Sequence, residues 1–138
     1  MSLLLRHPRT WLVLGWGLVL LVVVTGLMPG QSLPSTGVND KLEHTFAYAL
    51  LALWFAGIYP RTRYPVIALG LFGLGILVEV GQSVMHVGRQ ADLRDVLANT
   101  LGIATGLVLA WVWLGGWAQW VEARVDGWNQ RVETRRRP

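Results

Sequence analysis

The sequence contains no cysteine and few charged residues. Without cysteine, the chain can form neither a disulfide framework nor a thiolate zinc site. Asp, Glu, Lys and Arg make up only 14% of the 138 residues, whereas they make up about 25% of typical soluble domains. The sequence also lacks a P-loop, a GxGxxG fingerprint and an HExxH pair. These absences argue against a soluble enzyme built on a nucleotide-binding loop or on a dedicated zinc site.

Apolar residues, by contrast, make up 53% of the chain and lie in long runs. A helix needs about 20 mostly apolar residues to cross a bilayer. Four runs approach that length, and segments containing Gly, Pro or Arg separate them. The predicted fold class is therefore all-α, a polytopic membrane protein with a bundle of four transmembrane helices. These helices cover about residues 11–28, 40–59, 65–87 and 92–114 of one domain, residues 1–116.

The first apolar run has an alternative interpretation as a cleaved signal peptide. It is long for the apolar part of such a peptide, and Val24-Thr25-Gly26 matches a small-x-small cleavage site poorly. These features favour a transmembrane helix that stays in the protein.

Residues 117–138 form a separate tail. Its apolar residues recur at spacings of three, four or seven: Trp117, Trp120, Val121, Val125, Trp128 and Val132. This spacing predicts a cytoplasmic amphipathic helix that lies in the membrane interface, with the basic residues 135–137 near anionic lipid. A solvated, frayed tail is the alternative.

Glycines are concentrated in the third and fourth apolar runs. Gly70, Gly73 and Gly75 thin the third helix, and Gly102 and Gly106 form a GxxxG pair in the fourth. Small residues of this kind let the backbones of membrane helices approach closely. We therefore expect neighbouring helices to pack against both stretches.

The distribution of Lys and Arg predicts the orientation of the chain in the membrane. Nine of the 12 lie in the N-terminus, the turn at 60–64 and the tail, and three lie in the other two connections. Cytoplasmic segments of membrane proteins carry the excess of basic residues. Both termini are therefore predicted to be cytoplasmic, and the connections near residues 40 and 90 face outward.

Polar residues in the second, third and fourth helices lie near these outward-facing ends. They are Asp40, Lys41, His44 and Tyr48, then Glu79 and Gln82, and finally Asp92, Asp95 and Asn99. Their helical spacings place those of each helix on one side, and the three groups lie at similar depths. A carboxylate inside a membrane is costly and usually faces a bundle interior or a wet cavity. We therefore predict one polar cluster that opens away from the cytoplasm.

Structural roles are the alternative for several of these residues. Asp40 with Glu43, and Asp92 with Asp95, match the spacing of a capping box at a helix start. Capping does not account for residues inside helices, such as Glu79 and His44. For these two, the alternative is an ion pair or hydrogen bond between helices.

Chemical roles can be assigned to the cluster as a hypothesis. Glu79 is a candidate general base with His44 as its acid partner, and Asp92 and Asp95 complete the candidate catalytic set. The candidate substrate-binding residues are Asp40, Lys41, Tyr48, Gln82, Arg89 and Asn99. Within this set, Lys41 and Arg89 suit a phosphate or carboxylate. A divalent cation held by Glu79, Asp92 and Asp95, with His44, is an alternative.

The order and spacing of these polar residues resemble the VanZ-like family of small bacterial integral membrane proteins. The resemblance covers about residues 40–106 and rests on Asp40, Lys41, His44, Glu79, Gln82, Arg89, Asp92, Asp95 and Asn99. It implies a protein of a few helices in the bacterial cytoplasmic (inner) membrane. The member that names the family is associated with low-level resistance to the glycopeptide teicoplanin, so the resemblance makes a link to resistance an expectation here.

Three functions are compatible with this pattern. The first is a membrane enzyme that acts at the outer, periplasmic face on a cell-envelope lipid or a lipid-linked cell-wall precursor. The second is a non-enzymatic module that binds a lipid headgroup or a glycopeptide. The third is an assembly subunit in a homo-oligomer or with a partner membrane protein. Nucleic acid is not expected as a partner, because the basic residues flank membrane segments.

Overall fold

The computed structural model describes residues 5–28, 39–85 and 92–136, and helices are the only regular elements in those ranges. They are α1 (Pro8–Leu27), α2 (Asp40–Ile58), the short 3-10 helix η2 (Arg61–Arg63), α3 (Tyr64–Met85), α4 (Leu93–Leu109), the π-helical turn η3 (Ala110–Leu114) and α5 (Trp117–Arg136). The prediction of an all-α protein is confirmed. The predicted helix bounds differ from these by only a few residues, and Pro8 starts α1 where its missing N–H is not needed.

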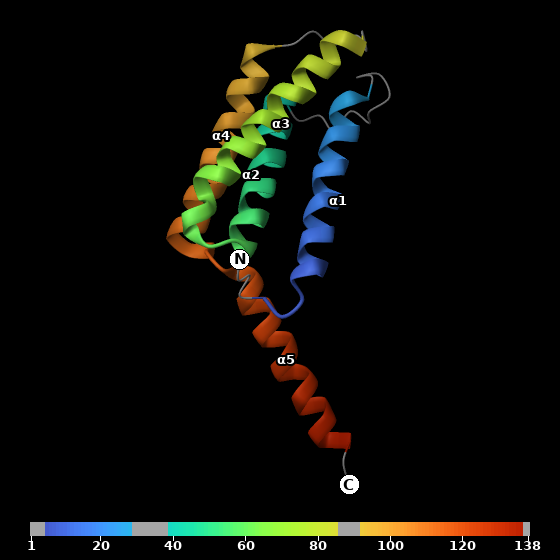
Figure 1. Ribbon diagram of the computed structural model, residues 1–138, viewed down its shortest axis with the longest axis vertical. Coiled ribbons are helices and arrows are strands. Elements are labelled where there is room, and N and C mark those ends of the chain that lie inside the picture. The colour runs from blue at the N-terminus through green and yellow to red at the C-terminus, as the bar shows by residue number, and fades with distance from the viewer. Residues whose placement is uncertain (1–4, 29–38, 86–91, 137–138) are drawn as a thin grey trace.

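The first four α-helices run alternately in opposite directions, side by side (Figure 1). The start of α1, the end of α2, the start of α3 and the end of α4 share one end of the bundle, called here the termini end. The other ends of these helices share the opposite end, called here the polar end. This arrangement puts the polar residues of α2, α3 and α4 at the same end, as the sequence predicts.

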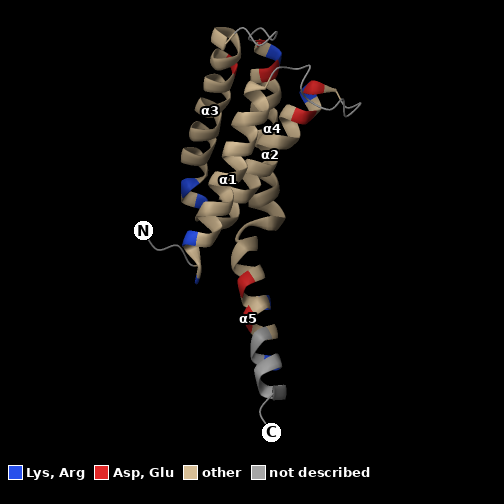
Figure 2. Ribbon diagram, turned by 90° about the vertical axis from the view of Figure 1, so that its right-hand side faces the viewer, with Lys and Arg blue, Asp and Glu red and all other residues tan. Residues whose placement is uncertain are grey.

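Within the residues that the structure describes, three helical segments are long and apolar enough to cross a membrane. They are Pro8–Leu27, Arg61–Met85 and Leu93–Leu114. In α2 the first two turns carry Asp40, Lys41, Glu43 and His44, so this helix is less apolar overall. Charged residues gather at the two ends of the bundle and in α5, and the body between them is almost free of charge (Figure 2). The chain is therefore a membrane protein by its helices.

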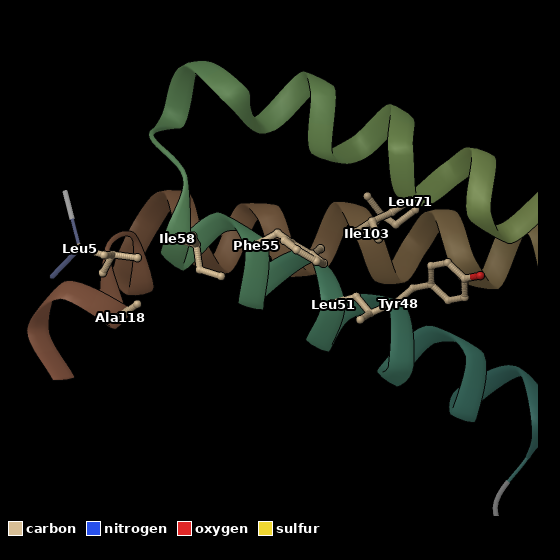
Figure 3. Packing of buried hydrophobic residues seen from close by; sticks show 9 residues of the cluster. Leu5, Tyr48, Leu51, Phe55, Ile58, Leu71, Ile103 and Ala118 are labelled. Atoms are coloured by element: carbon tan, nitrogen blue, oxygen red, sulfur yellow. The ribbon is translucent and has the colours of Figure 1, made fainter. Parts of the chain in front are cut away.

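The buried core lies along α2. Tyr48, Leu51, Phe55 and Ile58 of this helix are each at most 9% exposed, and they pack toward residues of α3 and α4 such as Leu71 and Ile103 (Figure 3). Large apolar side chains on the outward faces of the helices are exposed. This distribution suits a bundle surrounded by lipid, because exposed apolar side chains are favourable against lipid tails and unfavourable against water.

The closest helix contact joins α2 and α4 through glycine. A Cβ on Gly102 would overlap the carbonyl oxygen of Thr45, and one on Gly106 would overlap that of Ala49. Only glycine leaves room for the two backbones at these positions. The predicted role of the GxxxG pair is confirmed.

The glycines of α3 behave differently from the prediction. A Cβ on Gly75 would lie 3.1 Å from Asn99 Nδ2, so this position does face α4 closely. Gly70 and Gly73 have nothing within 4 Å of such a Cβ. The expected close approach is therefore wrong at these two positions, because they lie on a part of α3 that no helix covers.

α4 ends in an irregular turn before α5 begins. The π-helical turn η3 is followed by Gly116, whose φ of 75° is readily adopted only by glycine. Arg61 Nη2 donates to the Trp111 carbonyl oxygen at 2.9 Å and its guanidinium lies over the Trp111 ring. Gly116 thus forms the turn between η3 and α5, and η3 is fixed to the turn between α2 and α3.

The start of α5 is anchored to the termini end of the bundle. The rings of Trp117 and Trp54 lie 5.1 Å apart and those of Trp117 and Trp11 5.2 Å apart, measured between centroids. Glu122 accepts hydrogen bonds from the backbone N–H of Arg6 at 2.7 Å and from Trp11 Nε1 at 2.9 Å. These contacts are missing from the sequence analysis, because nothing in the tail's spacing indicates what its first turns touch.

The tail forms one helix, α5, as its spacing predicts. From its anchored start, α5 continues away from the bundle along the bundle's long axis (Figure 1). Its exposed apolar residues Trp120 and Trp128 alternate with charged ones. The position of this helix in the membrane interface, on the cytoplasmic side, stays a prediction.

Candidate functional site

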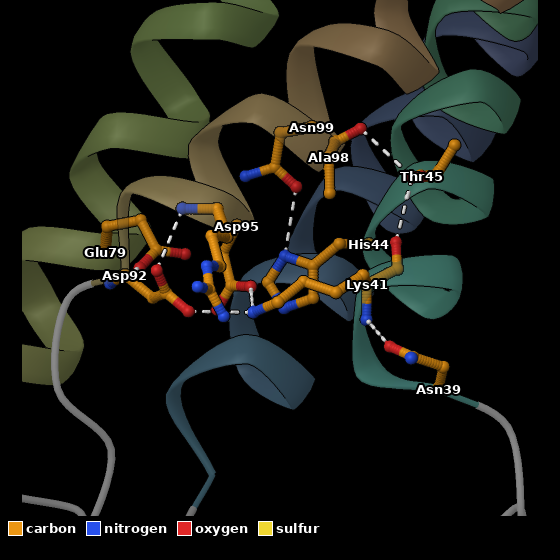
Figure 4. Close-up of polar contacts among 10 residues, drawn as sticks. Asn39, Lys41, His44, Thr45, Glu79, Asp92, Asp95, Ala98 and Asn99 are labelled. Atoms are coloured by element: carbon orange, nitrogen blue, oxygen red, sulfur yellow. Dashed lines mark hydrogen bonds and ion pairs between the residues drawn. The ribbon is translucent and has the colours of Figure 1, made fainter.

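The polar end of the bundle gathers side chains from α2, α3 and α4 into one cluster (Figure 4). Three of its members are deeply buried: Glu79 is 3% exposed, Asn99 2% and Asp95 6%. Lys41 and Asp92 stand at its outer edge, with side chains 36% and 41% exposed. The cluster is therefore a polar site that begins at the surface and continues between the helices.

The start of α2 is capped by a residue that the sequence analysis did not single out. The side chain of Asn39 accepts a hydrogen bond from the backbone N–H of Lys41 at 2.9 Å. The predicted capping box that begins at Asp40 is wrong, because Asp40 already lies in the first turn. Its carboxylate therefore belongs to the surface of the site, next to the turn that carries Lys41.

The start of α4 is capped by Asp92, as expected. Asp92 accepts from the backbone N–H of Arg94 at 2.9 Å. In a capping box, the acid three residues later would accept from the N-cap N–H. Here the N–H of Asp92 donates instead to Glu79 Oε2 of α3, at 3.2 Å. Because Glu79 takes that position, the Asp95 carboxylate is left for another partner.

That partner is Lys41 of α2. Its ammonium forms an ion pair with Asp92 at 2.9 Å and a second one with Asp95. The N–H of Arg94, and after it the Lys41 ammonium, hold the pKa of Asp92 below its ordinary value. The pair ties the first turn of α2 to the first turn of α4. Lys41 is thus largely neutralised before any ligand arrives.

His44 is oriented by Asn99. Its Nδ1 lies 3.0 Å from Asn99 Oδ1, an oxygen that can only accept. In the tautomer with its proton on Nδ1, His44 donates to this oxygen, and the lone pair of Nε2 is then available to a proton or a metal ion. Such a bond from the second ring nitrogen is typical of histidines that bind metals or act in catalysis.

The deep end of the site contains buried polar atoms. Among the described residues, Tyr48 OH and Asn99 Nδ2 have no hydrogen-bond partner, and both residues are 2% exposed. They lie against the same stretch of α3, because a Cβ on Gly75 would be within 3.5 Å of both atoms. The floor of the site is thus built from the side chains of Tyr48 and Asn99 on the backbone of Gly75.

Two further polar residues hold helices together. Gln82, which is 1% exposed, donates from Nε2 to the carbonyl oxygen of Gly26 at the end of α1, at 2.7 Å. Its amide nitrogen is therefore used for packing α1 onto α3. Thr45 was not singled out from sequence, yet its hydroxyl lies 2.8 Å from Lys41 O and 3.2 Å from Ala98 O.

The donor atoms best placed for a cation differ from the predicted set. One ligand atom each from Asp40, His44 and Asp95 lies within 4.8 Å of the other two. Glu79 and Asp92, which the sequence analysis placed in a metal site, do not belong to this group. Of the candidate residues, Arg89 lies outside the described ranges, and the structure brings the others to the polar end.

Comparisons with known proteins agree with the residue pattern. The family model VanZ/LLP1 matches residues 21–114, which is more than half of the chain. The chain belongs to the VanZ-like family. An uncharacterized fission yeast protein, C11E3.10 of Schizosaccharomyces pombe, is 34% identical over 102 residues, or 70% of this chain and 61% of the relative.

This chain spans about three fifths of the length of the fission yeast relative. No solved structure matches the chain. The bacterial inner membrane, expected from the family resemblance, stays a prediction.

Proposed function

We propose that this VanZ-like protein binds the phosphate headgroup of a membrane lipid or lipid-linked cell-wall precursor, at the outer face of a cytoplasmic membrane, through a divalent cation. The observation that carries this proposal is the group formed by Asp40, His44 and Asp95, whose donor atoms lie within 4.8 Å of one another at the polar end. Carboxylate oxygens and one imidazole are a donor set that suits Mn²⁺ or Mg²⁺.

The charge of the site favours a cation over direct phosphate binding. Asp40, Glu79, Asp92 and Asp95 bring four carboxylates to the site. Among the described residues, Lys41 and Arg94 are the basic side chains whose charges act on Asp92. An anionic headgroup would meet net negative charge there. A divalent ion changes that balance, because it can bind carboxylates on one side and phosphate oxygens on the other.

Lys41 has a specific part in this proposal. It is held by Asp95, which is also one of the three candidate ligands. A cation that takes the Asp95 carboxylate competes with the ammonium, and the ammonium is then available to the phosphate. Binding of the cation and binding of the headgroup would therefore favour each other.

The membrane arrangement supports contact with lipid. The helix α2 has 19 residues and lies alongside three helices that can each span a bilayer. We infer that α2 is the fourth transmembrane helix, with its polar first turns at the headgroup level. The positive-inside rule then places the polar end outside, opposite the basic termini end.

Binding of farnesyl phosphate to the purified full chain tests this proposal. This probe joins a phosphate to an isoprenoid tail, and farnesol is its uncharged control. We expect Mn²⁺ to raise the affinity for farnesyl phosphate at least tenfold over the affinity in EDTA, and to leave that for farnesol unchanged. Asp40→Asn should remove the Mn²⁺ effect, whereas Glu43→Gln, which removes a charge from the same turns of α2, should keep it. An affinity for farnesyl phosphate that is equal with Mn²⁺ and EDTA would refute the proposal.

A catalytic form of the function rests on His44. Its Nε2 is free to take a proton because Nδ1 is directed at Asn99 Oδ1, whereas Glu79 Oε2 already accepts from the backbone of Asp92. We therefore propose His44 as the acid–base residue and Glu79 as a residue that positions α4. Release of inorganic phosphate from farnesyl phosphate by the wild type, and its loss in His44→Gln, would support an enzyme. Intact farnesyl phosphate throughout would support a binding module.

The link to glycopeptide resistance rests on the family alone. If the site binds a cell-wall precursor, expression of the protein should change teicoplanin susceptibility in cells, and Asp40→Asn should abolish the change. Equal teicoplanin susceptibility with and without the protein would show that this member has no role in glycopeptide resistance.

A further inference from the structure

An open groove runs along the outside of the bundle between α1, α2 and α3. Its cavity has a volume of about 550 Å³, and Trp16, Phe55, Gly70 and Gly73 are among the residues that line it. The two glycines have empty space where a side chain would begin. Residues at its edge are turned outward, since Trp16 is 64% exposed. In a membrane this groove opens to lipid.

The groove has a chemically distinct end. Its lining is apolar along most of its length, but Tyr59 and Arg63 line it at the termini end. Of the described residues that line the groove, Arg63 is the one with a charge. Arg61 in the same turn is occupied by Trp111. Within the described ranges, the Arg63 guanidinium has no ion pair or hydrogen bond. The groove therefore presents a free positive charge where lipid headgroups begin.

The groove is longer than the hydrocarbon region of one leaflet is deep. Arg63 and Leu77 both line it and are fourteen residues apart in the α3 region. At about 1.5 Å per residue this is roughly 21 Å. One leaflet contributes about half of the ~30 Å hydrocarbon core. An acyl chain that starts at Arg63 can thus lie in the groove over its whole depth in that leaflet.

We propose that this groove is a specific site for an anionic phospholipid of the leaflet at the termini end. One acyl chain lies over Gly70 and Gly73, and Arg63 and Tyr59 bind the phosphate. The site is at the opposite end of the bundle from Asp40, His44 and Asp95, and it depends on none of them. In this proposal, Gly70 and Gly73 leave the space that the acyl chain occupies.

Native mass spectrometry of the detergent-purified full chain tests this site. The chain is titrated with phosphatidylglycerol or with phosphatidylcholine of the same acyl chains. We expect the first phosphatidylglycerol to bind the wild type about fivefold more tightly than phosphatidylcholine, because a basic side chain near anionic lipid contributes that much. Arg63→Gln should remove this preference. Arg9→Gln, which removes a positive charge from the same end outside the groove, should keep it.

A second pair of variants tests the groove itself. Gly70→Leu fills the groove and should abolish tight binding of the first lipid, whereas Gly17→Leu should leave it unchanged. Gly17 is also a helical glycine with nothing within 4 Å of its Cβ position, but it does not line the groove. Equal lipid binding by the two leucine variants, or an unchanged preference in Arg63→Gln, would overturn the proposal. The Asp40→Asn variant should bind phosphatidylglycerol like the wild type even though it loses Mn²⁺-dependent binding of farnesyl phosphate. The proposals for the two sites can therefore be refuted independently.

Discussion

At the residue scale, Glu79 performs a role that the sequence could not reveal. Its depth in α3 and its match to Asn99 in α4 follow from counting residues along two helices, and the structure confirms that both are buried at the polar end. Its partner, the N–H of Asp92, belongs to the backbone. Residue patterns show which side chains can meet, but they do not show which backbone groups are left without a partner.

Gln82 shows a second limit of the sequence. It follows Glu79 by three residues, so the two side chains are about 60° apart around the helix. That is close enough to suggest one site. It is also far enough apart for Gln82 to face α1 while Glu79 faces α4, and the structure has this arrangement.

The substitution Gln82→Met separates packing from ligand binding. It removes the hydrogen bond to Gly26 O and leaves that carbonyl at the end of α1 without its donor. We expect a loss of about 1–3 kcal/mol of stability, the usual cost of an unsatisfied buried group. Thermal unfolding in detergent measures this loss. Mn²⁺-dependent binding of farnesyl phosphate should stay unchanged. If the variant kept full stability but no longer bound farnesyl phosphate, Gln82 would be a ligand-binding residue instead.

Glu122 gives the protein a dependence on pH. Burial raises its pKa, but hydrogen bonds from Arg6 N, His7 N and Trp11 Nε1 outweigh burial and hold the pKa below the ordinary value of a glutamate. A folded-state pKa below the unfolded one means that the stabilisation is complete above the unfolded pKa. It is lost as the pH falls through the folded pKa.

The test of this dependence is thermal unfolding between pH 7 and pH 3. We expect the wild type to lose stability toward the acid end more steeply than Glu122→Gln, in which the titrating group is absent. At pH 7, Glu122→Ala should cost about 1 kcal/mol, as the loss of a helix cap does. Parallel pH curves for the wild type and Glu122→Gln would show that this carboxylate does not anchor α5.

At the element scale, glycine patterns predicted contacts unevenly. Gly102 and Gly106 are spaced by four and lie on the face of α4 that α2 covers, so the GxxxG prediction was correct. Gly70 and Gly73 looked equally suited to packing, yet no helix covers them. Sequence shows where a helix is thin. The partner that fills the space depends on where α1 lies relative to α3, which no local pattern specifies.

The substitution Gly106→Leu tests the α2–α4 contact. The new leucine side chain would overlap the backbone at Ala49. Unlike a flexible side chain, this backbone cannot change rotamer to relieve the overlap. We expect a destabilisation at or above the roughly 1–3 kcal/mol typical of overpacking. The matched control is Gly17→Leu, which meets nothing within 4 Å. Detergent-solubilised yield and melting temperature compare the two, and equal values would mean that α2 and α4 do not pack as described.

At the scale of the whole molecule, the separation of charge defines two ends. The polar end holds the carboxylates of α2 and α4, and the termini end holds the arginines that precede α1 and α3 (Figure 2). Length, hydropathy and the distribution of basic residues were enough to predict this bundle and the end at which its polar residues meet. They did not predict the direction of α5, because Trp117 and Glu122 set it through contacts with residues more than 50 positions away.

The absence of cysteine makes the orientation directly testable. Single-cysteine variants Asn39→Cys and Arg124→Cys place one reactive thiol at each end of the molecule. In intact spheroplasts, a membrane-impermeant maleimide should label Asn39→Cys and should label Arg124→Cys only after lysis. The reverse pattern would place the polar end in the cytoplasm and would exclude a periplasmic role.

The most direct test of the polar site uses the small number of histidines, three in the chain. In NMR spectra of the detergent-solubilised full chain, with imidazole signals assigned by single substitutions, Mn²⁺ is added below stoichiometry. The site formed by Asp40, His44 and Asp95 predicts that the His44 signals broaden first, whereas those of His7 at the termini end stay sharp. Sharp His44 signals, or equal broadening of His44 and His7, would contradict the existence of a cation-binding site between α2 and α4.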